Sequence, residues 1–124
     1  MADKFTIKID GKERDVKMTF GLLNALCRAV GDIDGATQMT MDQNLRDAVL
    51  VELLSERDKA GKITSNINLA EMEVSIDDVV DLLDWAGNHV LDFFLKGLER
   101  AKSLQDRNLL RIKALMPSQL GSAT

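Results

Sequence analysis

The chain has 124 residues, of which 45% are hydrophobic and 29% charged, a composition typical of a globular domain rather than a disordered chain. Its single cysteine and single histidine exclude an internal disulfide and a structural zinc module. No apolar run approaches the ~20 residues of a membrane span, and no signal-peptide core follows the first residues, so we expect a cytoplasmic protein that binds no membrane.

Charge is unevenly distributed along the chain, whose net charge is −4. Residues 99–124 hold five basic and two acidic residues, a net charge of +3, and residues 1–98 hold 11 basic and 18 acidic residues, a net charge of −7. An acidic body with a weakly basic end matches a phosphate backbone poorly, so we expect no binding to nucleic acid. We interpret the basic end as a solvated helix face in preference to a binding patch.

The N-terminal residues predict a β-hairpin over 4–18. Apolar and polar side chains alternate on both sides of Asp10-Gly11, a dipeptide typical of hairpin turns. A two-residue and a four-residue turn both place the apolar side chains on one face. The four-residue turn also sets Lys8 opposite Asp15, so we prefer it. This face should lie against helices, because a lone hairpin is barely stable in water.

The first helix is predicted over 20–30. Thr19 can cap its N-terminus, and Gly31 suits the left-handed conformation that ends many helices. Its apolar residues at helical spacing are Phe20, Leu23, Leu26, Cys27 and Val30. The next four residues, 32–35, are expected to be a loop.

The second helix is predicted over 41–58. Thr40 and Gln43 match a capping box, and the apolar residues that follow are spread widely around the helix. Residues 59–74 are compatible with a short strand or with an ordered loop, and a loop of that length in a small domain is uncommon.

A long helical region is predicted over 76–104, with Ser75 as its N-cap and a kink at 87–88, where glycine weakens the helix. A further helix is predicted over 106–116, before the only proline. The predicted fold is therefore mainly α with a small N-terminal β-hairpin, an α+β arrangement. We expect a single domain over 1–116, followed by a flexible tail at 117–124.

Few residues could carry catalysis. Cys27 and His89 form the only nucleophile–base combination of interest, but Cys27 lies on an apolar helix stripe, where cysteine acts as a small hydrophobe. Asp77, Asp81 and Asp84 share one helix face, which we interpret as a solvated acidic face because one face offers too few oxygens for calcium. We therefore expect no catalytic, metal or cofactor site, and no enzyme.

A second stripe on the late helix is less easily explained. Leu82, Trp85, His89 and Phe93 lie roughly 100–160° around the helix from its main apolar stripe. Two explanations are open: the hairpin or the second helix covers this stripe within the chain, or the stripe binds a partner, as exposed aromatic residues often do. These four residues are the candidate partner-binding site.

Several short motifs occur in an order that is typical of one protein family. The hairpin contains "I-D-G-K" and is followed by "T-F-G-x-L" at a helix start and "G-D" at its end, within residues 5–12, 16–23 and 30–32. Residues 82–85 and 90–96 supply a second match. The chain thus resembles the tail assembly chaperones of long-tailed (siphovirus) bacteriophages and of related gene-transfer particles.

The resemblance implies a non-enzymatic chaperone in the cytoplasm of a bacterial host. Such proteins bind the tape-measure protein, shield its apolar surface and recruit tail-tube protein, and they are usually absent from the mature virion. Many also occur in a longer, frameshifted form. The family shares no catalytic motif, so the resemblance assigns no active-site residue. The alternative is a small oligomeric structural or adaptor protein of a phage particle, in which the second stripe forms an interface in a homo-oligomer.

Overall fold

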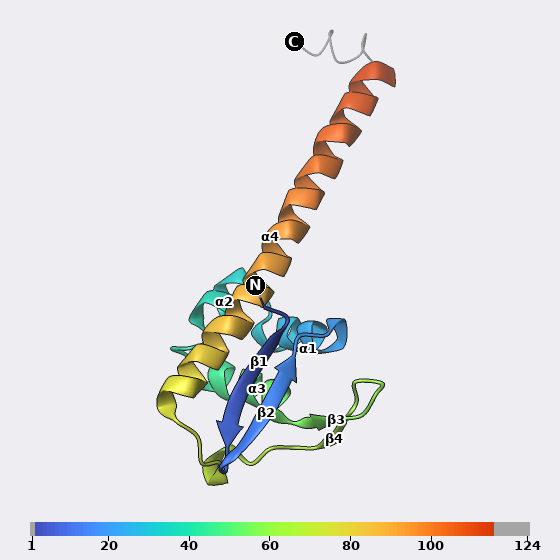
Figure 1. Ribbon diagram of the computed structural model, residues 1–124. Helices are drawn as coiled ribbons and strands as arrows, with labels where there is room; N and C mark the ends of the chain where they lie inside the picture. The colour runs from blue at the N-terminus through green and yellow to red at the C-terminus, as the bar shows by residue number, and fades with distance from the viewer. Residues whose placement is uncertain (1, 116–124) are drawn as a thin grey trace. The chain divides into compact units, whose positions relative to one another are not determined.

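In a computed structural model, which describes residues 2–115, the protein is mainly helical with an N-terminal antiparallel hairpin, as the sequence predicts (Figure 1). The elements are β1 (Lys4–Ile9), β2 (Lys12–Lys17), α1 (Phe20–Val30), α2 (Ile33–Gln38), α3 (Gln43–Leu54), β3 (Glu56–Arg57), β4 (Ile63–Ser65), a 3-10 turn (Leu69–Glu71) and α4 (Ile76–Leu115). Internal contacts divide the chain into two units, Met1–Asp92 and Phe93–Thr124. The predicted tail at 117–124 lies outside the described residues.

The hairpin turn has two residues. Ile9 pairs with Lys12, and both residues between them have positive φ, 52° at Asp10 and 78° at Gly11. Positive φ at both central positions is the mark of a type I′ turn, whose twist matches that of the flanking strands. The preferred four-residue turn is therefore wrong, because the Asp-Gly pair already satisfies the tighter turn.

The strand register follows from this turn. Lys8 pairs with Glu13 rather than with Asp15, and Asp15 pairs with Thr6. The Thr6 hydroxyl donates a hydrogen bond of 2.7 Å to the Asp15 carboxylate. On the other face of the hairpin Ile7 and its apolar neighbours are buried, so the predicted apolar face is the one that packs on the helices.

Helix α1 has the predicted bounds and caps. The Thr19 hydroxyl accepts a hydrogen bond from the Leu22 amide, and Gly31 ends the helix with φ 84°. The sequence places Phe20 on the apolar stripe of this helix, but its side chain is 70% exposed, so this prediction is wrong. The buried face is centred near Leu26, and Phe20 lies about 120° around the helix from that residue.

The segment that was predicted to be a loop after α1 forms the short helix α2. The Asp32 carboxylate accepts a hydrogen bond of 2.9 Å from the Gly35 amide and so caps the helix. Gly35 packs directly against the end of α1, since a Cβ at this position would lie 2.0 Å from the Val30 carbonyl oxygen. This contact allows only glycine.

Helix α3 is shorter than predicted at both ends. Asp42, not Thr40, caps it, because the Asp42 carboxylate accepts hydrogen bonds from the Asn44 and Leu45 amides at 2.9 and 3.1 Å. The helix ends at Leu54 because the chain there turns into strand β3. The segment that follows contains both a short antiparallel pair, β3–β4, and ordered connections, the two forms that the sequence left open.

Helix α4 runs without interruption through residues 87–88, where the sequence predicts a kink, and through residue 105, where it predicts a break. Gly87 approaches Met39 closely, since a Cβ on it would lie 3.1 Å from the Met39 sulfur, so this glycine marks a packing contact rather than a helix end. The predicted division at residue 105 is wrong, because no helix-breaking residue is present there. No helix in the described part of the chain is long and apolar enough to cross a membrane.

The core of the first unit combines the hairpin, the three short helices and the start of α4. Its fully buried side chains include Ile7, Leu26, Met39, Val49, Leu54, Leu82, Leu83 and Val90. The hairpin turn is held to the segment before α4 by two hydrogen bonds of 2.8 Å between Asp10 and Glu73. These contacts hold the hairpin turn beside the segment that leads into α4.

Candidate functional site

Two of the four residues predicted to bind a partner, Leu82 and Trp85, pack within the chain itself. Leu82 is fully buried in the core. Trp85 is half-buried: its indole N–H donates a hydrogen bond of 2.7 Å to the Ala2 carbonyl oxygen, and its ring lies 5.7 Å from that of Phe5. Ala2 and Phe5 at the N-terminus therefore contact Trp85, which corresponds for that residue to the first of the two explanations that the sequence left open.

His89 joins the same cluster. Its Nε2 lies 2.8 Å from the Ala2 carbonyl oxygen, and its ring packs edge-on against that of Trp85 at 5.1 Å. Because a carbonyl oxygen can only accept, the Nε2 of His89 carries the hydrogen of this bond. His89 thus serves to anchor the N-terminus, and its contacts in the structure are with the chain itself.

Phe93, the fourth predicted residue, belongs to the second unit and is 41% exposed. It begins a segment of α4 in which most large apolar side chains face solvent. These exposed side chains are Phe93, Leu95, Leu98, Leu104, Leu109, Leu110, Ile112 and Leu115, with exposed fractions from 41% to 79%. We call residues 93–115 of α4 the exposed apolar helix.

The exposed apolar helix is the feature that the sequence interpretation missed. Apolar residues at a spacing of three or four continue along it, and this spacing reads equally well as a core-facing stripe. The length of the helix could have distinguished an exposed apolar stripe from a core-facing one. The preceding elements are all 12 residues or shorter, against 40 residues in α4. An exposed apolar surface of this extent is typical of a protein–protein interface.

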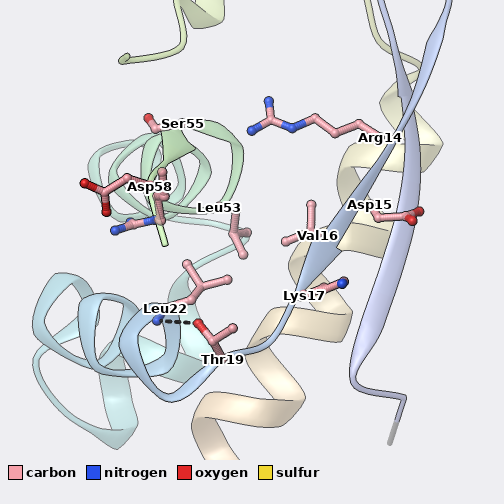
Figure 2. Close-up of a pocket in the computed structure, with 10 residues that line it drawn as sticks. Arg14, Asp15, Val16, Lys17, Thr19, Leu22, Leu53, Ser55 and Asp58 are labelled. Carbon is pink, nitrogen blue, oxygen red and sulfur yellow. Dashed lines mark hydrogen bonds between the residues drawn. The ribbon is translucent and has the colours of Figure 1, made fainter. Parts of the chain in front are cut away.

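A pocket lies in the first unit between β2, α1 and the end of α3 (Figure 2). Val16, Leu22 and Leu53 supply buried apolar walls. The charged residues that line it are of both signs, Arg14, Asp15, Lys17, Arg57 and Asp58. This mixture of charges selects no particular class of ligand.

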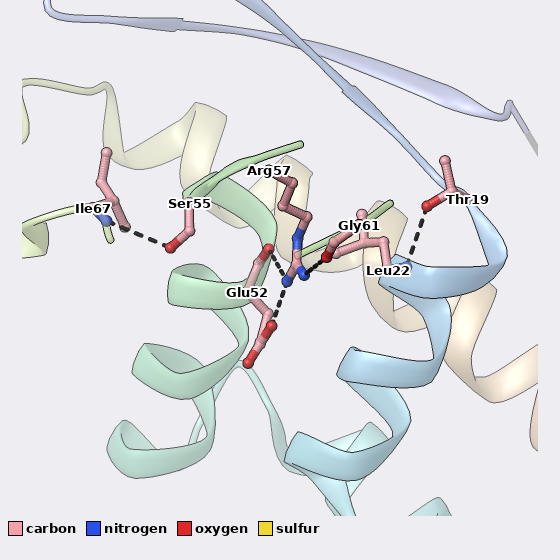
Figure 3. Close-up of polar contacts among 7 residues, drawn as sticks. All are labelled: Thr19, Leu22, Glu52, Ser55, Arg57, Gly61 and Ile67. Carbon is pink, nitrogen blue, oxygen red and sulfur yellow. Dashed lines mark hydrogen bonds and ion pairs between the residues drawn. The ribbon is translucent and has the colours of Figure 1, made fainter. Parts of the chain in front are cut away.

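Polar contacts beside this pocket hold the β3–β4 segment to α3 (Figure 3). The Arg57 guanidinium pairs with the Glu52 carboxylate and donates a hydrogen bond of 2.8 Å to the Gly61 carbonyl oxygen. The buried Ser55 hydroxyl accepts a hydrogen bond of 3.4 Å from the Ile67 amide. Within residues 2–115 the buried Nε of Arg57 has no hydrogen-bond partner, whereas the other polar atoms named here pair within the chain. We interpret the cluster as structural because these paired contacts join the β3–β4 segment to α3.

The residues considered for catalysis and metal binding have ordinary surroundings. Burial raises the pKa of the Cys27 thiol, which lowers the fraction of reactive thiolate at neutral pH. Asp77, Asp81 and Asp84 are exposed, as expected for a solvated face. Among residues 2–115, no three histidine, cysteine, aspartate or glutamate side chains are grouped so that they could hold a metal ion.

The chain matches no family model, no curated protein and no solved structure in comparisons with known proteins. The resemblance to tail assembly chaperones therefore rests on the short motifs in the sequence.

Proposed function

We propose that the protein is a non-enzymatic phage tail assembly chaperone that binds the tape-measure protein and helps to recruit tail-tube subunits. The observation that supports this proposal best is the exposed apolar helix, whose large side chains lie open to solvent over residues 93–115. The motifs at 5–12, 16–23 and 30–32, which resemble those of such chaperones, support it independently.

The exposed apolar helix offers a simple binding mechanism. Apolar anchors at a spacing of three or four residues can pack into the grooves of a second helix, the mode by which amphipathic helices are commonly bound. A tape-measure protein is long and helical, so it would present many such grooves. Burial of apolar surface, at about 25 cal/mol per Å², would drive binding, and the entropy cost of association would keep it reversible.

Capture from a lysate tests this proposal. The tagged full chain serves as bait in cells that produce phage particles, and mass spectrometry identifies what is retained. We expect the tape-measure protein to be recovered, with or without tail-tube subunits. Recovery of the bait alone, or of head and portal proteins, would instead support the structural or adaptor alternative.

A matched pair of variants makes the capture specific. Leu98→Ser with Ile112→Ser removes two exposed anchors of the exposed apolar helix, and we expect recovery of the tape-measure protein to fall about tenfold or more. Phe20→Ser with Met41→Ser changes two apolar residues of the first unit that are even more exposed, and it should leave recovery unchanged. Equal losses in both variants would refute a role for the exposed apolar helix.

A further inference from the structure

We infer that the exposed apolar helix recognises an acidic amphipathic helix. This inference deepens the proposed function and rests on it for the identification of the partner as a helical protein. It is carried by the joint arrangement of exposed apolar and basic side chains on one helical segment.

The apolar side chains of this segment define a direction around the helix. At about 100° per residue, Phe94 and Ile112 lie on one line along the helix, since 18 residues complete about five turns. Leu98 and Leu109 lie about 40° and 60° from this line on one side, and Leu115 lies about 60° from it on the other. The segment therefore has an apolar stripe from Phe94 to Leu115, about 32 Å long at a rise of about 1.5 Å per residue, and Leu110 and the remaining large apolar residues lie about 80–160° from its centre line.

The charges that border the stripe are basic. Lys102, Lys113 and Arg111 are the charged residues nearest the stripe, about 80–100° from its centre line and on both sides of it. The acidic Asp106 and Glu99, and the other three basic residues, lie about 120–160° away. In total, residues 93–115 hold six basic and two acidic residues, a net charge of +4. All of these charged side chains are exposed.

A helix that covered this stripe would have its flanking positions beside these basic side chains. In paired helices, the charges at such flanking positions decide which partner is accepted. Glutamate or aspartate at those positions would pair with Lys102, Arg111 and Lys113, and lysine or arginine would be repelled. The expected partner thus has an apolar seam bordered by acidic residues.

The same charges argue against two other occupants. A second copy of the exposed apolar helix would bring a net charge of +4 against +4, which opposes self-pairing. A nucleic acid would pair with the basic side chains, whose net charge with the acidic ones is only +4, but it would leave the apolar stripe uncovered. An acidic helix satisfies both the apolar and the charged parts of the surface.

Two synthetic peptides test the inference with the full-length chain. Both contain three heptads with leucine in the seam, and they differ only in their flanking residues, glutamate in one and lysine in the other. In about 0.1 M salt we expect the glutamate peptide to bind at least about tenfold more tightly than the lysine peptide, measured by fluorescence anisotropy. Raising the salt to about 0.5 M should weaken its binding severalfold.

A charge-reversal variant provides the decisive control. Lys102→Glu, Arg111→Glu and Lys113→Glu together change the charge of the segment from +4 to −2 and should reverse the preference in favour of the lysine peptide. Lys8→Glu, Lys12→Glu and Lys59→Glu make the same change of charge at exposed positions of the first unit and should leave the preference intact. Circular dichroism of each variant confirms that it is folded.

Three results would overturn the inference: equal binding of the two peptides, displacement of the glutamate peptide by a short DNA duplex, or self-association of the chain that blocks the peptide. Failure of the proposed function is distinguishable from these. If the glutamate peptide binds as expected but capture from the lysate yields no tape-measure protein, the inference stands and the proposed partner is wrong.

Discussion

The indole N–H of Trp85 donates a hydrogen bond of 2.7 Å to the carbonyl oxygen of Ala2, a residue 83 positions earlier in the chain. His89 shares that oxygen at 2.8 Å, and Phe5 packs beside the indole ring. The N-terminus is thereby attached to α4 at Trp85 and His89. This relationship assigns Trp85 to the fold of the first unit, and the partner surface that we propose is the exposed apolar helix.

Trp85→Ala should destabilise the protein. It removes a hydrogen bond to Ala2 and a half-buried ring that packs on Phe5, and we expect the free energy of unfolding to fall by about 2 kcal/mol or more. Urea denaturation followed by circular dichroism measures this change, since the variant has no tryptophan. Phe20→Ala, at an exposed site, should change stability little. A Trp85→Ala variant as stable as the parent would contradict the assignment.

Two glycine substitutions should have opposite effects. Gly35→Ala places a methyl group against the Val30 carbonyl oxygen, so we expect it to lower the free energy of unfolding by about 2 kcal/mol or more. Gly97→Ala meets no atom within 4 Å in the middle of α4 and should raise helix stability by up to about 1 kcal/mol. Thermal unfolding of both variants checks the pair, and equal effects would show that the contact at Gly35 is not tight.

Arg57→Ala should loosen the β3–β4 segment. The change leaves the Glu52 carboxylate without its partly buried partner and frees the Gly61 carbonyl oxygen, for an expected cost of about 2 kcal/mol in the free energy of unfolding. Arg46→Ala removes an exposed pair with Asp47 and should cost less than about 0.5 kcal/mol. Limited proteolysis should cut the Arg57 variant first between β3 and β4; uncut protein would argue against this role.

Asp15 should contribute to the pH dependence of stability. The Thr6 hydroxyl donates to its carboxylate, and with Lys4 nearby it holds the pKa of Asp15 below the ordinary value of 3.8. A group whose pKa is lower in the folded state stabilises the protein above its unfolded pKa, and this contribution is lost as the pH falls through the folded pKa. Asp15→Asn should therefore lower stability at pH 7 and lessen its loss on acidification, as measured by urea denaturation at several pH values.

Thr6→Val provides the control for this effect. It removes the hydroxyl donor and leaves the Asp15 carboxylate in place, so it should shift the pH dependence in the same direction as Asp15→Asn. Unchanged pH dependence in both variants would show that this pair does not contribute.

Local signals in the sequence predicted local structure well. Thr19 and Gly31 mark the ends of α1, and Asp10-Gly11 marks the hairpin, because each acts through hydrogen bonds or backbone conformation within a few residues. Competing caps were harder to rank: Thr40 and Asp42 both suit a helix start, and the choice of Asp42 depends on how the chain leaves α2.

Burial was harder to predict than secondary structure because it depends on long-range contacts. Trp85 and His89 contact Ala2, which lies 83 and 87 positions away in the chain, and helical spacing cannot reveal such contacts. The same spacing at Leu98 and Ile112 describes side chains that are about half exposed. Periodicity thus identified the apolar faces but could not say which of them the chain itself would cover.

The most direct test of the account is amide hydrogen exchange of the full chain, alone and with the tape-measure protein. Helical amides of residues 93–115 have little tertiary packing to protect them, so we expect fast exchange in the free chain, slower exchange over 76–92, and strong new protection of 93–115 on binding. Protection of 93–115 in the free chain, or new protection confined to the first unit, would contradict the claim that the exposed apolar helix binds the partner.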